Sequence, residues 1–343
     1  MEKVRFGKTG LMVSRIGFGG IPIQRLSKPE AAAVTREAID LGVNFIDTAN
    51  AYGDSEEKIG EAIKGVNRDR LIIASKSTAT DKKTFLRHLD LCLKRLGSDY
   101  VDLYQTHNVS SPETRDAIFA SGGAFEGLTE AVRQGKVRFP AFSSHNIPLA
   151  VELMKTGLFA SVQLPFNFVD DAAAEEAIPL AKKLDMGFIC MKPFGGGLLD
   201  NAGLAIRYLL RFENIVPDPG IEKIAEIREI AAIVNENKPL SAEDEKTISG
   251  LKSELGKWWC HRCDYCQPCP QGIPISSALT LRSLIKRGDF DFVFRLASAG
   301  MEKARSCLEC GECVKRCPYK LDIPRLLKKQ ITLWEETLRA RAG

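Results

Sequence analysis

The chain of 343 residues is 44% hydrophobic and 27% charged, a composition that excludes a disordered chain, a collagen-like repeat and a small disulfide-framework protein. Its length allows either one large barrel or sheet with a small appendage, or two medium domains. It contains no run of about 18 apolar residues, and Met1–Arg5 does not begin a secretory signal. We therefore expect a cytoplasmic protein with no membrane partner, whose cysteines are reduced or bound to metal.

Charge and cysteine are both concentrated near the C-terminal end. The formal net charge of +4 combines +6 from residues 258–343 with −2 from residues 1–257. No nucleic-acid motif accompanies the basic end, so we expect no nucleic-acid partner. Eight of the ten cysteines lie between Cys260 and Cys317, whereas Cys92 and Cys190 stand singly in apolar stretches and are predicted to be buried.

The first 235 residues alternate short β-rich runs with longer segments of helical period, which is typical of parallel strands joined by crossover helices. The predicted strands are Ser14–Gly19, Asn44–Thr48, Leu71–Lys76, Val101–His107, Val137–Ser143, Ser161–Phe166, Gly187–Lys192 and Asn214–Val216. Eight strands are the number that closes a TIM barrel, so we predict an α/β fold with a (β/α)8 barrel over residues 1–235. The opening segment, Val4–Val13, predicts a hairpin laid across one mouth of the barrel.

Polar side chains stand at or near the carboxyl ends of these runs. They are Asp47, Lys76, His107, Ser143, Ser144, Gln163 and Lys192. In an eight-stranded barrel these ends form one rim, which is where barrel enzymes carry their active sites. Tyr52 follows Asp47 by five positions on the next loop and can reach the same rim.

Tyr52, Lys76 and Asp47 together have the chemistry of a proton donor. An ammonium such as that of Lys76 lowers the pKa of a neighbouring tyrosine, and a carboxylate such as that of Asp47 holds the ammonium in place. A histidine can orient a carbonyl oxygen or assist the proton transfer, and His107 is the candidate. The alternative is a structural ion pair between Asp47 and Lys76, with Tyr52 and His107 as packing residues.

The segment Asp47-Thr-Ala-Asn-Ala-Tyr52-Gly, with Lys76 in Ile-Ala-Ser-Lys and His107 in Tyr-Gln-Thr-His, resembles the signature of the aldo-keto reductases. The resemblance covers residues 1–235. It implies a barrel that binds NADP or NAD and reduces a small-molecule carbonyl substrate, an aldehyde or a ketone. Tyr52 is then the general acid of the reaction, supported by the other three catalytic residues.

The resemblance also implies a set of nucleotide-binding residues. They are Ser143, Ser144, Gln163, Met191, Lys192, Phe194, Gly195, Gly196, Gly220 and Lys223. The first three resemble residues that hold the nicotinamide carboxamide, and the glycines after Lys192 resemble a pyrophosphate-binding loop. Met191 stands where many members carry an aromatic ring. Acidic Glu222 beside Lys223 leaves the choice between NADP and NAD open.

Two cysteine blocks follow a polar stretch, residues 236–257, that is predicted to be a linker with a short helix. The first block contains Cys260, Cys263, Cys266 and Cys269, and the second contains Cys307, Cys310, Cys313 and Cys317. The second has the spacing of the bacterial ferredoxin run for a [4Fe–4S] cluster, in which the fourth cysteine serves the other cluster of two-cluster proteins. We expect the eight thiolates to hold two [4Fe–4S] clusters.

Zinc is the alternative, because eight thiolates can also hold two zinc ions. The continuous triple spacing and the Cys-Pro pair in both blocks favour iron. The first block has two residues rather than three before its last cysteine. This difference leaves open which cluster Cys269 and Cys317 each serve.

Residues 258–343 contain three segments of helical period, Ser276–Arg287, Phe290–Arg305 and Leu326–Arg339, and they predict a helical ferredoxin-type domain in which Trp334 packs. Both parts together resemble the iron–sulfur-containing branch of the aldo-keto reductases. We interpret the chain as an NAD(P)H-dependent reductase whose clusters can exchange electrons with a partner protein. The alternative is a redox-sensing or electron-transfer protein whose barrel binds the nucleotide with little turnover.

Overall fold

The computed structural model describes residues 1–262 and 264–342, and the chain divides into two compact units. The first unit contains residues 1–195 and 199–241, and the second contains residues 196–198 together with the chain from residue 242 onward. The sequence predicts a linker over residues 236–257, whereas helix α10 (Ala242–Leu255) lies in the second unit. Three acidic residues in its first turn and Lys252 in its last turn complement the helix dipole.

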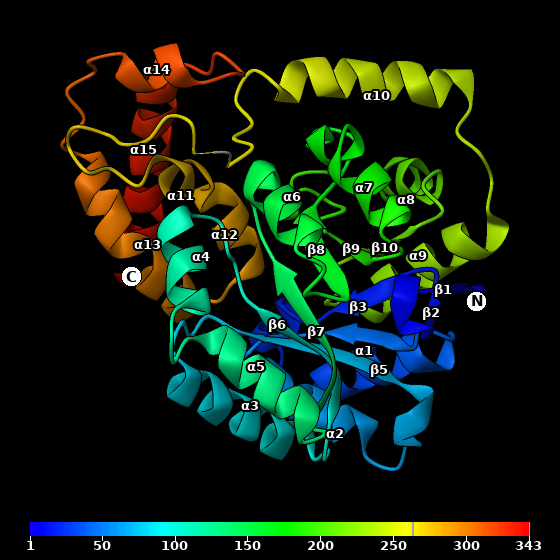
Figure 1. Cartoon of the computed structure of the whole chain (residues 1–343). Coiled ribbons are helices and arrows are strands. Elements are labelled where there is room, and N and C mark those ends of the chain that lie inside the picture. Colours follow the sequence, from blue (N-terminus) through cyan, green and yellow to red (C-terminus); the bar gives the residue numbers. More distant parts are fainter. Residues whose placement is uncertain (263, 343) are drawn as a thin grey trace. The chain divides into compact units, whose positions relative to one another are not determined.

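The first unit is a barrel of eight parallel strands surrounded by helices (Figure 1). In chain order the strands are β3 (Gly17–Gly19), β4 (Phe45–Asp47), β5 (Ile72–Ser77), β6 (Val101–Thr106), β7 (Val137–Ser143), β8 (Ser161–Pro165), β9 (Gly187–Met191) and β10 (Ile215–Asp218). Neighbours pair in the order β3 to β10, and a parallel bridge between Gly19 and Gly220 joins the last strand to the first. The predicted (β/α)8 barrel is confirmed.

The first and last predicted strands differ in extent from those observed. Ser14 ends the preceding strand, because its hydroxyl donates to the carbonyl of Ile16 at 2.6 Å and turns the chain before β3 begins. The last strand runs two residues further than predicted, since Pro217 and Asp218 stay in register with β9. Proline is a common sign of a strand end, but here the pairing continues through it.

Helices α1 to α9 belong to the first unit, and local sequence signals set their ends. They are α1 (Lys28–Asp40), α2 (Ser55–Ile63), α3 (Lys82–Leu96), α4 (Pro112–Phe119), α5 (Ala124–Arg133), α6 (Ile147–Lys155), α7 (Ala177–Lys183), α8 (Ala202–Leu210) and α9 (Ile224–Glu236). Ser27 and Glu30 form a capping box at the start of α1. Asp81 accepts from the backbone N–H of Thr84 at the start of α3, and Gly97 ends that helix with φ of 63°.

The predicted hairpin is confirmed. Strands β1 (Lys3–Arg5) and β2 (Met12–Ser14) pair antiparallel, and Phe6 between them enters the core at the amino-terminal end of the barrel strands. The Phe6 ring lies 5.9 Å from the Phe45 ring, measured between centroids. A Cβ atom at Gly187 would lie only 2.3 Å from the Phe6 ring, so this close approach requires glycine.

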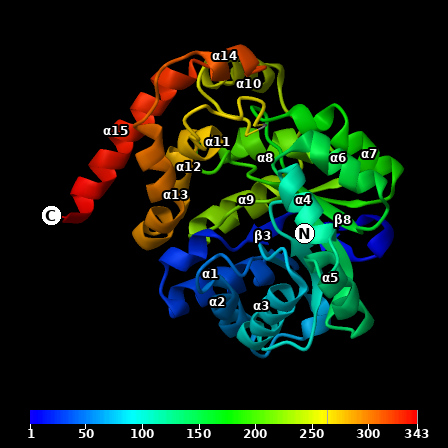
Figure 2. The ribbon, with the colours of Figure 1, turned by 60° about the vertical axis from the view of Figure 1, so that its left-hand side comes forward.

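The second unit is helical. After α10 it contains α11 (Ile275–Leu279), α12 (Leu281–Arg287), α13 (Phe290–Ala304), α14 (Glu312–Arg316) and α15 (Ile323–Ala342), with α13 and α15 side by side (Figures 1 and 2). Trp334 is 1% exposed in the core of this unit, which confirms its predicted packing role. Thr280 separates α11 from α12, where the sequence predicts one helix. Within the described residues, no helix combines the length and the apolar character that crossing a membrane would require.

We predict that Phe6→Ala lowers the free energy of unfolding of the barrel by about 3–5 kcal/mol, because it leaves a cavity among apolar side chains. Phe6 is 2% exposed, whereas Met12 on the same hairpin is 49% exposed, so Met12→Ala is the matched control and should change little. Urea unfolding followed by circular dichroism measures both. Equal effects of the two substitutions would show that the hairpin does not close the barrel core.

Candidate active site and cysteine centres

A buried ion pair lies at the carboxyl ends of two neighbouring strands, β4 and β5. Lys76 Nζ lies 2.5 Å from Asp47 Oδ2 and 2.7 Å from the carbonyl oxygen of Thr48. Asp47 and Lys76 are 2% and 1% exposed. Burial is the largest single effect and by itself would lower the pKa of the Lys76 ammonium, but interactions with Asp47, Tyr52 and Asp218 together outweigh it and raise the pKa above the ordinary lysine value. Lys76 is therefore a fixed positive charge at neutral pH.

The structure brings Tyr52 and His107 to this ion pair. Lys76 Nζ lies 4.9 Å from the centroid of the Tyr52 ring. The Tyr52 and His107 rings meet edge to face, with centroids 5.8 Å apart and an interplanar angle of 82°. The four residues that the sequence singled out for proton transfer thus form one contiguous group.

His107 is the neutral member of this group. Burial, followed by the positive charges of Lys76 and Lys192, lowers the pKa of His107 to about 3. Among the described residues, none bonds its Nδ1 atom, which is buried. A neutral imidazole can donate or accept a hydrogen bond without adding charge beside the lysine.

The residues predicted to hold the nicotinamide carboxamide lie on the same rim. The Ser143 hydroxyl accepts from the backbone N–H of Asn108 at 2.9 Å, and the Ser144 hydroxyl accepts from that of Asn146 at 3.0 Å. The Gln163 amide nitrogen donates to Asp218 at 3.3 Å. Its oxygen Oε1 is buried and has no hydrogen-bond partner in the part of the chain that the structure describes. Gln163 is thus the one of the three with an unused buried polar atom.

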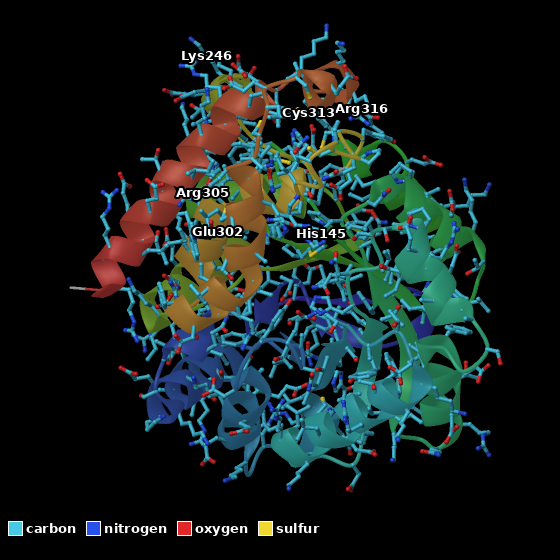
Figure 3. The ribbon with its side chains drawn as sticks, turned by 90° about the vertical axis from the view of Figure 1, so that its left-hand side faces the viewer. His145, Lys246, Glu302, Arg305, Cys313 and Arg316 are labelled. Carbon is cyan, nitrogen blue, oxygen red and sulfur yellow. The ribbon has the colours of Figure 1, made fainter. Side chains whose placement is uncertain are left out.

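Met191 and Lys192 lie at the end of β9, where Lys192 has a φ of 59°. Lys192 Nζ lies 2.7 Å from His145 Nε2, and His145 Nδ1 lies 2.9 Å from Asn108 Oδ1. Figure 3 labels His145. Sequence reasoning missed this histidine, although it directly follows Ser143 and Ser144 at a strand end and the order of residues could have indicated it.

The glycine loop after Phe194 is strained for any other residue. Gly195, Gly196 and Gly197 have φ of 57°, 72° and 85°, which L-residues rarely adopt. Gly196 and Gly197 belong to the second unit, in which Ser283 and Lys286 donate hydrogen bonds to their carbonyl oxygens at 3.2 and 2.7 Å. Phe194 belongs to the first unit.

The region around the last two predicted nucleotide-binding residues, Gly220 and Lys223, contains ion pairs. Gly220 forms the bridge that closes the barrel, and Lys223 is exposed at the start of α9. Glu222 forms an ion pair with Arg25. This pairing partly neutralises the acidic side chain that the sequence places beside Lys223.

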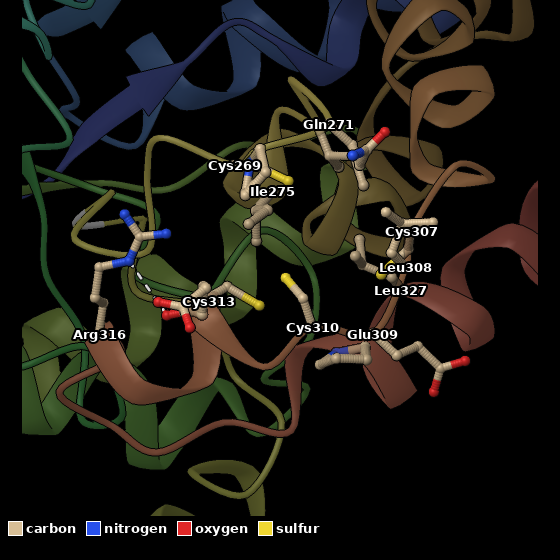
Figure 4. Close-up of a pocket in the computed structure, with 14 residues that line it drawn as sticks. Cys269, Gln271, Ile275, Cys307, Leu308, Glu309, Cys310, Cys313, Arg316 and Leu327 are labelled. Atoms are coloured by element: carbon tan, nitrogen blue, oxygen red, sulfur yellow. Dashed lines mark hydrogen bonds between the residues drawn. The ribbon is translucent and has the colours of Figure 1, made fainter.

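The cysteines of the second unit line two cavities, and each cavity draws on both blocks. One cavity, of about 130 Å³, is lined by Cys307, Cys310 and Cys313 of the second block and by Cys269 of the first (Figure 4). The other, of about 20 Å³, is lined by Cys260, Cys266 and Cys317. Cys263, which the sequence predicts as a fourth ligand there, lies outside the described residues. The last cysteine of each block therefore faces the other block's cavity.

Hydrogen bonds tie the two blocks together. Arg316, on α14 close to Cys313, donates to the carbonyl oxygens of Gln267 and Pro268 at 3.0 and 2.9 Å (Figure 3). Within the first block, the Gln267 side chain accepts from the backbone N–H of Cys269 at 2.8 Å. Thiolates are the ligands that bind iron–sulfur clusters, although within the described residues no three of these side chains are close enough together to hold a single metal ion.

The two isolated cysteines have no part in these cavities. Cys92 and Cys190 are fully buried in the barrel unit, and burial raises the pKa of both thiols well above the ordinary value. Protonated, inert thiols in a core behave as small hydrophobic side chains. Their predicted role is confirmed.

Comparison with known proteins agrees with this geometry. A family model described as "Aldo/keto reductase family" matches residues 15–204, and one described as "4Fe-4S dicluster domain" matches residues 259–322. An uncharacterized oxidoreductase of Bacillus subtilis, YrpG, is 30% identical over 233 residues, which cover 60% of this chain and 70% of that protein. The class of protein is therefore an oxidoreductase with an iron–sulfur domain.

Solved structures show the same barrel. The thermostable aldo-keto reductase Tm1743, solved with the inhibitor epalrestat, superimposes with a TM-score of 0.63 at 27% identity, over 73% of this chain and all of that one. An aldo-keto reductase from Klebsiella pneumoniae in complex with NADPH has a TM-score of 0.63 at 22% identity, over 73% and 95% of the two chains. The chain belongs to the aldo/keto reductase family and carries a C-terminal 4Fe-4S dicluster domain.

We predict that the His107 imidazole stays neutral between pH 8 and about pH 4, because its pKa of about 3 lies far below the ordinary 6.5. Nitrogen NMR of the ring, assigned with a His107→Gln variant, measures this directly. The unfolded chain binds a proton between pH 6.5 and 3 that the folded chain does not, so folding should weaken as the pH falls through this window. His107→Gln should weaken less. Titration of the ring near pH 6.5 would contradict the assignment.

Proposed function

We propose that the protein reduces an aldehyde or a ketone with NADPH or NADH, and that Tyr52 is the general acid. The observation that carries the proposal is the convergence of Tyr52 and His107 on the buried pair of Asp47 and Lys76. A structural ion pair alone has no need of a tyrosine ring beside its ammonium or of a neutral histidine beside that ring.

Each side chain then has a distinct task. Bound reduced nicotinamide supplies a hydride, and the carbonyl oxygen that receives the developing negative charge needs a proton. Tyr52 gives that proton, and the positive charge of Lys76 stabilises the phenolate that remains. Asp47 holds Lys76 in place through the contact of 2.5 Å. Neutral His107 orients the carbonyl oxygen by a hydrogen bond.

For the nucleotide we propose the residues that the family resemblance implies. Gln163, with its unpartnered buried oxygen within the described structure, supports a contact with the carboxamide. Met191 would pack against the nicotinamide ring, and the Lys192–Gly196 loop would approach the pyrophosphate. The Klebsiella pneumoniae protein of the same fold was solved with NADPH. Lys223 near Glu222 supports use of either NADPH or NADH.

For the second unit we propose two [4Fe–4S] clusters, one in each thiol-lined cavity. The crossed arrangement of Cys269 and Cys317 supports them, because three closely spaced thiolates with a remote fourth is the ligand pattern of two-cluster ferredoxins. Bound clusters would supply one-electron transfer. Cys310 is exposed, which favours electron exchange with a partner protein at that edge and keeps an electron-transfer role as the second candidate function.

We predict that Tyr52→Phe lowers the turnover of a carbonyl substrate at least about a hundredfold and leaves nucleotide affinity nearly unchanged, because a positioned general acid contributes on that scale. Tyr100→Phe is the matched control. The Tyr100 hydroxyl bonds Asp69 at 3.1 Å, and the residue precedes β6 at the opposite end of the barrel. Anaerobic steady-state assays and nucleotide titration measure both variants. Turnover by Tyr52→Phe that equals that of the unmodified protein would refute the proposed general acid.

We predict that two cysteine substitutions remove one cluster when both residues line the same cavity and both clusters when they line different cavities, whichever block each cysteine belongs to. The unmodified protein purified without oxygen should contain about eight iron atoms per chain. Cys310→Ser alone, and Cys310→Ser combined with Cys269→Ser, should both retain about four iron atoms per chain, since these two thiols share a cavity. Combining Cys310→Ser with Cys317→Ser should remove nearly all iron. Iron analysis and electron paramagnetic resonance decide this, and loss of both clusters from the Cys269–Cys310 pair would contradict the crossed arrangement.

A further inference from the structure

A second buried carboxyl group lies beside the Asp47–Lys76 pair. Asp218 ends β10, the strand that closes the barrel, and is 6% exposed. A Cβ atom at Gly19 would lie 3.2 Å from the Asp218 carbonyl oxygen, and Gly19 pairs with Asp47 on the next strand, so Asp218 and Asp47 flank a position that carries no side chain. The proposed proton transfer does not use it, and the predicted eighth strand ended two residues before it.

Among the described residues, Asp47 and Asp218 each have one buried carboxyl oxygen that receives no hydrogen bond. Asp47 uses Oδ2 to bind Lys76, and Asp218 uses Oδ2 to accept from Gln163. The remaining Oδ1 atoms of both are buried, and no group in residues 1–262 or 264–342 bonds either one. Two adjacent carboxylates cannot both ionise in a site that excludes water, whereas one shared proton satisfies both oxygens.

The barrel makes room for this arrangement on the side of β3. A Cβ atom at Gly17 would lie 3.1 Å from Asp218 Oδ1 and 2.7 Å from the Phe45 ring. A larger residue at position 17 would therefore push against the carboxyl group. Because Gly17 has no side chain, the Asp218 carboxyl group can occupy this position in the barrel interior.

The charged and titratable groups around Asp218 come from several strands. Asp47 on β4 and Lys76 on β5 face it, the protonated Cys190 thiol lies on β9, and Arg15 binds the backbone at the other end of β10. Burial, followed by the negative charge of Asp47, raises the pKa of Asp218 well above the ordinary carboxyl value, although Lys76 opposes this. Asp218 is therefore the member of the carboxyl pair that more readily holds a proton.

We propose that Asp218 is a positioning residue of the active site, which shares one proton with Asp47 and holds the Gln163 amide through its other oxygen. The resulting chain of hydrogen bonds runs from the ammonium of Lys76 to Gln163, whose free oxygen faces the proposed carboxamide site. The kinetic consequences rest on the proposed reductase function, whereas the shared proton does not.

This arrangement fixes the charge beside Tyr52. With a proton on the carboxyl pair, Lys76 meets one negative charge, and the pair and the ammonium together are neutral. Ionisation of Asp218 would add a second buried negative charge and oppose formation of the Tyr52 phenolate. The shared proton thus keeps the tyrosine active as an acid, and its loss at high pH would reduce turnover.

Infrared spectroscopy tests the shared proton without any assay of activity. A protonated carboxylic acid has a C=O stretching band that carboxylates lack, so the full-length protein at pH 7 should show this band and lose it in Asp218→Asn. The control is Asp102→Asn, because the Asp102 carboxylate is paired with Arg68 and Arg138, each at 2.7 Å. Should Asp218→Asn not fold, the band of the unmodified protein should still disappear as the pH is raised. Absence of the band would overturn the proposal.

Kinetics test the positioning role. Asparagine can donate to Asp47 and accept from Gln163 as protonated aspartate does, so Asp218→Asn should keep turnover within about threefold and leave only the alkaline decline that ionisation of Tyr52 causes. Asp218→Ala should lower turnover at least about tenfold, the scale of one unmade buried hydrogen bond. Equal losses in both variants, or none in Asp218→Ala, would overturn the proposal. A protein that shows the infrared band but reduces no carbonyl would instead count against the proposed function.

Discussion

The rim of the barrel depends on one buried carboxylate–ammonium pair. Asp47 and Lys76 are almost fully excluded from water, so each needs the other for charge compensation. Removing one partner of such a pair typically costs about 3–5 kcal/mol, because an uncompensated charge stays behind. The pair also accounts for its surroundings: the ammonium lies against Tyr52, and its field helps to keep His107 neutral. A buried ion pair is a weak source of stability, but it holds its charges at fixed positions, which suits a candidate active site.

Closure of the sheet adds to this group. Strand β10 meets β3 at Gly19 and Gly220, where the Gly19 N–H donates to the carbonyl of Pro219 at 2.8 Å. Gly19 admits this close approach because a Cβ atom there would lie 2.8 Å from that same carbonyl oxygen. The bridge brings the end of the last strand next to Asp47 on β4, although the two are far apart in the sequence. The electrostatics of the rim therefore depend on the barrel being closed.

The sequence was sufficient to predict the barrel and the group of Asp47, Tyr52, Lys76 and His107, because strand period is a local signal and the three segments that contain these residues resemble one family signature. The sequence did not predict Asp218 as part of the last strand, because a proline such as Pro217 usually marks a strand end. In the structure, pairing with β9 continues the strand past Pro217. The place of His145 directly after Ser143 and Ser144 was a usable signal, but its contacts with Lys192 and Asn108, which follow other strands, could not be predicted from the sequence. Spacing identified the eight cysteines but could not assign Cys269 and Cys317 to a cavity, because that assignment depends on how the blocks fold together.

The crossed cysteine blocks have a topological consequence. Since each cavity takes thiols from both blocks, a centre bound in either one closes the intervening segment, which contains α11 to α13, into a loop. Closing a loop removes conformational freedom from the unfolded chain, as a covalent cross-link does. Two bound centres would then each cross-link the same segment. Oxidative damage to one centre would leave the other cross-link intact, so the unit would unfold only after both centres were lost.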